Sequence, residues 1–333
     1  MPSDAAGRVR ALVERRGVVT NADVVRALSV SPATSHRLLR ALVVGGMLEP
    51  QGKGRAARYH LPHLRRRFAI AGLAEDQAWQ RVAADLTRIR PLETQEAASL
   101  RYAATEVINN AIEHSSGRTV VIDVAFEAGR TTVVSVRDDG VGVFHRVCED
   151  FGFASPHEAI VHLEKGKLTS DPARHSGEGL FFSSKAVARF RLESQGVAWV
   201  VDSIARDSGV AASDVQRGTR VVLTVVDGHT PHLEDVFRAY TDPESLEFVR
   251  TRTTVKLAAL GTGLVSRSEA RRLTARLGEF KHVTLDFTSI ELVGQGFCDE
   301  VFRVFAREHP GTAIEPVGMN DAVAFMVARA RAR

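Results

Sequence analysis

The sequence of 333 residues contains only two cysteines and no run of 18 apolar residues. Cys148 and Cys298 lie far apart, with no Cys-x-x-Cys pair or Cys/His cluster near them, so the sequence predicts neither a disulfide framework nor a metal site. A membrane-spanning helix would need about 20 consecutive apolar residues. The N-terminus, Met-Pro-Ser-Asp, also lacks the apolar core of a signal peptide. These absences predict a cytoplasmic protein with reduced thiols and no membrane partner.

Charge of each sign is present but unevenly distributed. Residues 1–67 hold 13 Lys/Arg and 4 Asp/Glu, a net charge of +9, whereas the remainder holds 31 and 36, a net charge of −5. Such segregation indicates a polyanionic partner for the N-terminal segment, most often nucleic acid. The length and the 44% hydrophobic content allow two or three globular domains.

The N-terminal segment has the pattern of three helices followed by a basic hairpin. We expect helices over 7–16, 21–28 and 32–44, the last with Ser31 as N-cap and Pro32 in its first position. Two short strands, 47–49 and 58–61, flank a tip of glycines and cations at 51–55.

This pattern resembles the winged helix-turn-helix of bacterial transcription regulators. The resemblance implies that the helix from Pro32 enters the major groove of double-stranded DNA and that the hairpin tip reaches phosphates. The residues that it offers to DNA are Thr34, Ser35, His36, Arg37 and Arg40 on the helix and Lys53 and Arg55 on the tip. Some winged helices bind protein instead, but the charge of +9 favours DNA.

The stretch from Glu106 to His114 predicts an amphipathic helix with functional groups on one face. Glu106, Asn110 and His114 are four residues apart and therefore stack away from the apolar stripe. A carboxylate one turn from a carboxamide can hold a polarised water beside an oxygen-ligated Mg²⁺, which suits phosphoryl chemistry.

Three glycine motifs follow this helix. Asp138-Asp139-Gly140-Val141-Gly142 ends a strand over 131–136, and two glycines beside a carboxylate let backbone approach a planar ligand. His175-Ser176-Gly177-Glu178-Gly179-Leu180 opens a helical run over 181–190, whose N-terminus could hold phosphate. Arg217-Gly218-Thr219 leads into a strand over 220–226.

Together these motifs resemble the four boxes of the GHKL (gyrase/Hsp90/histidine-kinase/MutL) ATPases, and the first box resembles anti-sigma-factor serine kinases most. The resemblance implies ATP and Mg²⁺ as cofactors, with Glu106 as general base, Asn110 as Mg²⁺ ligand and Asp138 as acceptor from the adenine amino group. The further nucleotide contacts that it implies are Gly140, Gly142, Gly177, Gly179, Leu180 and Thr219. Asp139 is expected to cap the turn instead. For His114 and His175, a structural role is as well supported as a functional one.

The segment 143–174 shows no clear periodicity and stands at the place of the ATP lid in this family. Lys165, Lys167 and Arg174 are candidates for reaching the terminal phosphate, with solvated lid charges as the alternative. Residues 64–68 predict a solvated linker or phosphate-facing rim. Residues 75–90 predict a helix, and this helix lacks the phosphoacceptor histidine that a sensor histidine kinase carries there.

Strands and helices alternate in the C-terminal part. Strands are predicted over 254–260, 282–287 and 313–317, and helices over 266–277, 297–307 and from 320 onwards, the first with a Ser-x-x-Glu capping box. This small α/β domain resembles STAS-like domains, relatives of the anti-sigma-factor antagonists. Val293-Gly294-Gln295-Gly296 stands where the antagonists carry a phosphorylatable serine, which argues against phosphorylation there.

The predicted fold class is α+β: a winged helix over 1–67, a GHKL α/β-sandwich ATPase over 75–228 and a small α/β STAS-like domain over 245–333. The predicted function is that of an ATP-binding, ATP-hydrolysing, DNA-binding transcriptional regulator. The alternative is an anti-sigma-type serine/threonine protein kinase that acts on a partner protein, and a third reading is a nucleotide-sensing scaffold without turnover. A protein partner for the STAS-like domain and a homodimer are compatible with the sequence.

Overall fold

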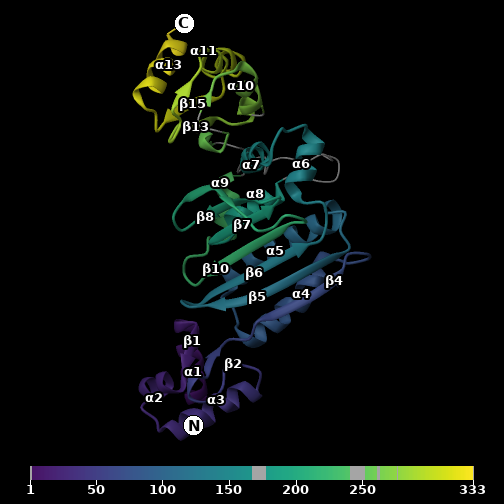
Figure 1. Cartoon of the computed structure of the whole chain (residues 1–333), viewed down its shortest axis with the longest axis vertical. Coiled ribbons are helices and arrows are strands. Elements are labelled where there is room, and N and C mark those ends of the chain that lie inside the picture. The colour runs from purple at the N-terminus through teal and green to yellow at the C-terminus, as the bar shows by residue number, and fades with distance from the viewer. Residues whose placement is uncertain (1, 167–177, 241–251, 261–262, 276, 333) are drawn as a thin grey trace. The chain divides into compact units, whose positions relative to one another are not determined.

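The computed structural model describes residues 2–166, 178–240, 252–260, 263–275 and 277–332 (Figure 1). Its residue contacts divide the chain into two units. Unit 1 contains Met1–Arg146 and Phe182–Leu233, and unit 2 contains Val147–Phe181 and Glu234–Arg333. The predicted α+β fold class is confirmed, and each unit is considered by itself below.

The first part of unit 1 is a winged helix. Its helices are α1 (Pro2–Arg16), α2 (Asn21–Leu28) and α3 (Pro32–Val44), and its sheet has the order β1 (Val18–Thr20), β3 (Arg58–His60), β2 (Glu49–Gln51). The Oγ of Ser31 accepts the N–H of Thr34 at 3.1 Å, so the predicted helix start is confirmed. The sequence pattern missed β1, because a strand of three residues shows too little alternation to be recognised.

The rest of unit 1 is an antiparallel sheet of seven strands covered by helices. The strand order is β4 (Leu64–Ala69), β5 (Thr119–Glu127), β6 (Thr131–Asp138), β10 (Arg220–Val226), β7 (Arg189–Ser194), β8 (Val197–Asp202), β9 (Asp207–Ala212). Two helices, α4 (Glu75–Ile89) and α5 (Thr94–His114), pack against each other, with α4 on β4 and α5 on β6 and β10. This arrangement gives the predicted α/β sandwich.

The prediction of a linker or rim over 64–68 is wrong, because these residues form the edge strand β4. Phe68 is buried and β4 pairs with β5 from Leu64 to Ala69, while Arg65, Arg66 and Arg67 are exposed. Three consecutive arginines hide the alternation of a strand, and charged side chains are common on edge strands, where they prevent pairing with other chains.

Two predictions about the middle of the chain are also wrong. The helical run over 181–190 ends early, since α8 is Gly179–Ala186 and β7 begins at Arg189. The segment from 143 is not without regular structure, because it contains α6 (Val143–Phe151) and α7 (Pro156–Lys165). Helix α7 begins with Ser155 as N-cap and Pro156 in its first turn, a start signal that the sequence reading overlooked.

Most of unit 2 is a small domain with a parallel sheet in the order β11 (Arg252–Lys256), β13 (His282–Asp286), β15 (Ala313–Val317). β12 (Gly263–Leu264) pairs with β14 (Leu292–Val293). The helices are α10 (Arg267–Thr274), α11 (Gln295–Asp299), α12 (Ala306–Glu308) and α13 (Asp321–Arg331), with a π-helical stretch over Glu300–Phe305. The strand expected to reach residue 260 ends at Lys256, where a 3-10 turn, Leu257–Leu260, follows.

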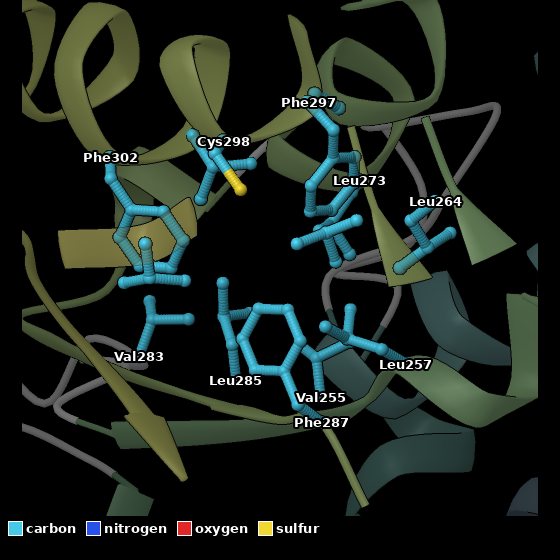
Figure 2. Packing of buried hydrophobic residues seen from close by; sticks show 14 of the residues in the cluster. Val255, Leu257, Leu264, Leu273, Val283, Leu285, Phe287, Phe297, Cys298 and Phe302 are labelled. Carbon is cyan, nitrogen blue, oxygen red and sulfur yellow. The ribbon is translucent and has the colours of Figure 1, made fainter. Parts of the chain in front are cut away.

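The core of this domain lies between the sheet and its helices. Figure 2 shows Val255, Leu285 and Phe287 from the sheet side facing Leu273, Phe297 and Phe302 from the helices. The thiol of Cys298 points into the same core, and its burial raises the pKa to about 11. Both cysteines are free, as predicted.

Within the described residues, no helix is both long enough and apolar enough to cross a membrane.

Candidate nucleotide site

Helix α5 places Glu106 and Asn110 on one face. Both residues are half-buried, whereas Ala104, Ile108 and Ala111 on the other side are buried in the core. The Nδ2 of Asn110 is buried and has no hydrogen-bond partner among the residues that the structure describes. A buried amide nitrogen without a partner calls for an explanation, and a bound ligand supplies one.

Asp138 ends strand β6 with its carboxyl buried, at 5% exposure. Its Oδ1 accepts the N–H of Gly140 at 2.9 Å and the N–H of Thr219 at 3.2 Å. Burial raises the pKa of this carboxyl above its usual range, and the two N–H donors oppose that rise. The side chain is therefore held in one orientation by two backbone groups.

The glycines beside Asp138 are required by the protein's own packing. A Cβ atom at Gly140 would lie 2.0 Å from the carbonyl oxygen of Ser115, and one at Gly142 would lie 2.4 Å from the Oγ of Ser194. Gly142 also has a φ of +96°, which side chains rarely allow. The structure thus gives these glycines a role within the fold, and their contact with a nucleotide stays a prediction.

Asp139 does not cap its own turn, so that prediction is wrong: Asp138 accepts the N–H of Gly140 there, and Asp139 binds the start of β5 instead. Its Oδ1 accepts the N–H groups of Arg118 at 2.7 Å and Thr119 at 2.9 Å, and its Oδ2 accepts the hydroxyl of Thr119 at 3.0 Å. The hydrogen bond from the Thr119 backbone is the main reason that the pKa of Asp139 is lowered.

Thr219 connects two parts of the predicted site. Its N–H donates to Asp138, and its Oγ1 accepts the N–H of Val143 at the start of α6, at 3.0 Å. Gly179 and Leu180 form the first turn of α8. Four residues of the predicted site or lid lie outside the described part of the chain: Lys167, Arg174, His175 and Gly177.

Lys165 is neither a phosphate ligand nor a solvated charge, so both readings of it are wrong. The side chain is 1% exposed, and its Nζ donates to the carbonyl oxygens of Leu273 at 2.6 Å and Ala275 at 3.3 Å. These carbonyls lie at the C-terminal end of α10. No pattern within the segment itself could predict a partner more than 100 residues away.

The exposed face of α3 carries His36, Arg37 and Arg40, as the predicted DNA contact requires. Ser35 does not belong to this face: it is fully buried, and its Oγ donates to the carbonyl oxygen of Asn21 at 3.2 Å. Its assignment as a DNA contact is therefore wrong, because Ser35 falls on the inner side of the helix with Leu39 and Leu42.

The hairpin tip is described in part. Lys53 is exposed in the turn between β2 and β3, and the side chain of Arg55 lies outside the described part. Arg58, exposed at the start of β3, adds a cation that the sequence reading did not select.

The winged helix is joined to the ATPase sheet at the turn between β5 and β6. The N–H groups of Gly129 and Arg130 donate to the carbonyl oxygens of Arg15 at 3.3 Å and Glu14 at 3.2 Å, at the end of α1. Ile89 at the end of α4 is part of the winged-helix core, and Phe126 packs against it. We call this contact the junction.

A cluster of charged side chains surrounds the junction. Arg130 pairs with Asp227 at 3.1 Å and with Glu14 at 3.9 Å, and the guanidinium of Arg90 donates to the carbonyl oxygen of Arg130. Arg90 is 1% and Glu96 4% exposed. Burial lowers the pKa of Arg90 and raises the pKa of Glu96. The negative charge of Asp227 raises the pKa of Glu96 further.

Three family models match separate parts of the chain. Residues 9–52 match the IclR helix-turn-helix domain, residues 71–203 the histidine kinase-like ATPase domain, and residues 269–324 a STAS-like domain of unknown function. No curated protein sequence matches the chain. The fold and these matches support a DNA-binding regulator that contains an ATP-binding module. The chain carries a histidine kinase-like ATPase domain between an IclR-type helix-turn-helix and a STAS-like domain, as predicted.

Proposed function

We propose that this protein is a transcriptional regulator whose DNA binding depends on ATP. In this proposal Asp138 accepts a hydrogen bond from the adenine amino group, and Glu106 is the general base of hydrolysis. The remaining nucleotide contacts are proposed at Gly140, Gly142, Gly177, Gly179, Leu180 and Thr219.

The described residues fit Mg²⁺ as a cofactor shared with phosphate. The unpartnered amide of Asn110 is the side chain that we propose as its ligand, since amide oxygen and nitrogen can exchange places by a rotation of the amide. When bound, Mg²⁺ would neutralise phosphate charge, and it usually takes few protein ligands beside phosphate oxygens and water. No group of three His, Cys, Asp or Glu side chains that could hold a metal occurs among the described residues.

The course of three elements supports the link between ATP and DNA. Each element connects the junction with the proposed site: α5 (Thr94–His114) carries Glu96 and Asn110, β6 (Thr131–Asp138) begins after Arg130 and ends at Asp138, and β10 (Arg220–Val226) lies between Thr219 and Asp227. α5 has 21 residues and therefore spans about 30 Å. Rigid elements of this kind can carry a shift at one end to the other.

A second candidate function, protein serine/threonine kinase, has its own support in the first motif. Glu106, Asn110 and His114 lie one turn apart on α5, in the spacing that resembles the anti-sigma-factor kinases. The C-terminal domain would then be one place for a protein partner. A homodimer stays a prediction from sequence.

The proposal is tested first by calorimetry of ATP binding to the full chain and to Asp138→Asn. The amide presents a donor where the adenine amino group needs an acceptor, so we expect the affinity to fall at least about 100-fold. Asp139→Asn is the matched control, because this neighbouring carboxylate binds Arg118 and Thr119 and has no proposed contact with the nucleotide. Equal ATP affinity in wild type and Asp138→Asn would refute the site.

Labelled ATP then separates the functions. Release of free phosphate supports an ATPase, and label on a partner protein supports the kinase. Binding without either product supports a nucleotide sensor without turnover.

A further inference from the structure

Helix α7 belongs structurally to the C-terminal domain, although in sequence it is part of the predicted ATP lid. Residues 147–181 cluster with 234–333 and not with the ATPase sheet. Val161 of α7 is 3% exposed and is a member of the C-terminal core, together with Val255, Leu257 and Leu273. We call α7 the lid helix and its contact with the C-terminal domain the lid contact.

A buried lysine fixes the end of the lid helix. The last carbonyls of an α-helix lack partners within the helix and carry its negative end. Lys165 donates to two such carbonyls, those of Leu273 and Ala275, at the end of α10. A lysine is almost never fully buried unless it is paired, so this arrangement ties the C-terminal end of α7 to that of α10.

An ion pair joins the other end of the lid helix to the same α10. The Oε1 of Glu158 lies 3.2 Å from the Nε of Arg272, and the Oε2 of Glu158 accepts the N–H of Ala154 at 2.9 Å. The Glu158 side chain is 8% and the Arg272 side chain 51% exposed. Because Arg272 is the exposed partner, its charge can be reversed by mutation without changing a buried side chain.

The start of α8 is held by unit 2 as well. Phe181 directly follows Gly179 and Leu180 of the predicted phosphate motif, and its ring contacts that of Tyr240 edge-on at 5.0 Å between centroids. A Cβ atom at Gly166, just after α7, would lie 3.0 Å from the Phe181 ring. Gly166 and Phe181 therefore lie close together within unit 2.

The lid contact is not packed as tightly as a domain interior. A cavity of about 420 Å³ lies between α7 and the C-terminal domain, lined among others by Ser155, His157, His162, Leu260, Leu264 and Arg272. Interiors contain few voids larger than a water molecule. The contact can therefore be weakened by surface changes while the core of the C-terminal domain stays intact.

We propose that the C-terminal domain controls nucleotide exchange by holding the lid helix. This inference rests on the proposed function, since it needs the chain to bind ATP and the predicted lid to respond to it. Holding α7 in place lowers the entropy that is lost when the lid orders around ATP, so the lid contact slows ATP release. A protein that binds the C-terminal domain and disturbs α10 would then accelerate release.

The test uses the full chain and a fluorescent ATP analogue, with its dissociation rate measured by stopped flow. Arg272→Glu places a carboxylate against Glu158 and is expected to raise the dissociation rate about tenfold. Glu158→Arg combined with Arg272→Glu restores opposite charges and should bring the rate back towards that of wild type. Arg267→Glu, an exposed site on the same helix, is the matched control and should keep the wild-type rate.

Hydrogen exchange of the amides in α7 and α10 provides a readout that does not need nucleotide. We expect faster exchange in Arg272→Glu and in Lys165→Glu, which opposes the α10 carbonyls with a negative charge. Unchanged exchange in both variants would refute the lid contact. Faster exchange with an unchanged dissociation rate would refute its control of the nucleotide, and absence of analogue binding in wild type would refute the proposed function instead.

Discussion

The junction in unit 1 and the lid contact in unit 2 are built from different interactions. Within the described residues, the junction leaves the Nε and Nη1 of Arg90 and the Oε1 of Glu96 buried without hydrogen-bond partners. In the lid contact, the Oε1 of Glu158 is also buried without a hydrogen-bond partner among the described residues, but Lys165 donates to two carbonyls and Val161 joins an apolar core. A polar network that is only partly satisfied costs free energy, so alternative arrangements lie close in energy. We therefore expect the charged cluster at the junction to rearrange more readily than the lid helix, which the apolar core around Val161 also holds.

The largest effect is expected from Glu106→Ala, which should leave the protein in its ATP-bound state. Positioned general bases contribute roughly 10²- to 10⁴-fold in rate, so turnover should fall at least about 100-fold while ATP still binds. The variant would allow the junction and the lid contact to be compared in a single nucleotide state. Phosphate release and calorimetry measure the two quantities, with Glu113→Ala, exposed on the same helix, as control. Equal turnover in Glu106→Ala and wild type would exclude Glu106 as the base.

A smaller effect is expected from Arg130→Ala at the junction. This change removes the side-chain pairs with Asp227 and Glu14 and leaves the backbone hydrogen bonds between the β5–β6 turn and α1 in place. If ATP changes DNA affinity about tenfold in wild type, that response should shrink to less than about threefold, which is a loss of roughly 0.7 kcal/mol of coupling. The affinity for ATP, measured without DNA, should change little.

DNA binding by fluorescence anisotropy with and without ATP measures this coupling. Arg81→Ala removes the same charge from the exposed side of α4 and should keep the full response. If ATP changed the DNA affinity of Arg130→Ala as much as that of wild type, the Arg130 pairs would not couple the nucleotide site to DNA binding.

The smallest effect is a pH dependence of stability at the junction. The pKa of Glu96 is raised above its ordinary value of 4.5, chiefly by burial. The folded state therefore holds the proton more tightly, and the stability from this group is present below pH 4.5 and lost as the pH rises through the raised pKa. Glu96→Gln should remove this dependence.

Urea unfolding of wild type and Glu96→Gln over a series of pH values checks this sign. As the pH rises, the free energy of unfolding of wild type should fall relative to that of Glu96→Gln. The opposite slope would mean that attraction to Arg90 outweighs burial, and that the junction is a strong ion pair after all.

The sequence predicted those elements whose signals are local. The start of α3 at Ser31 and Pro32 and the capping box from Ser266 to Glu269 each depend on hydrogen bonds to nearby backbone, and the structure contains both. The spacing of Glu106 and Asn110 likewise placed both on one helix face without knowledge of the rest of the chain.

The sequence could not predict features that depend on distant partners. Residues 64–68 were misread because their strand character arises from pairing with β5, more than 50 residues later. Lys165 was misread because its partners lie on α10. Ser35 shows the limit within a single helix, since a small polar residue gives no sign of whether it faces solvent or the interior.

The central claim is that the nucleotide state of the ATPase domain controls DNA binding. The most direct test measures the affinity of Glu106→Ala for a selected DNA site at fixed salt, with ATP, with ADP and without nucleotide. Salt is fixed because we expect Lys53 and other cations of the winged helix to attract any duplex through its phosphates, an attraction that salt weakens. We predict about a tenfold difference between ATP and no nucleotide, equal to about 1.4 kcal/mol, and by linkage the same factor in ATP affinity when DNA is added. Identical DNA affinities in all three conditions would contradict this prediction and would mean that the two domains are merely joined.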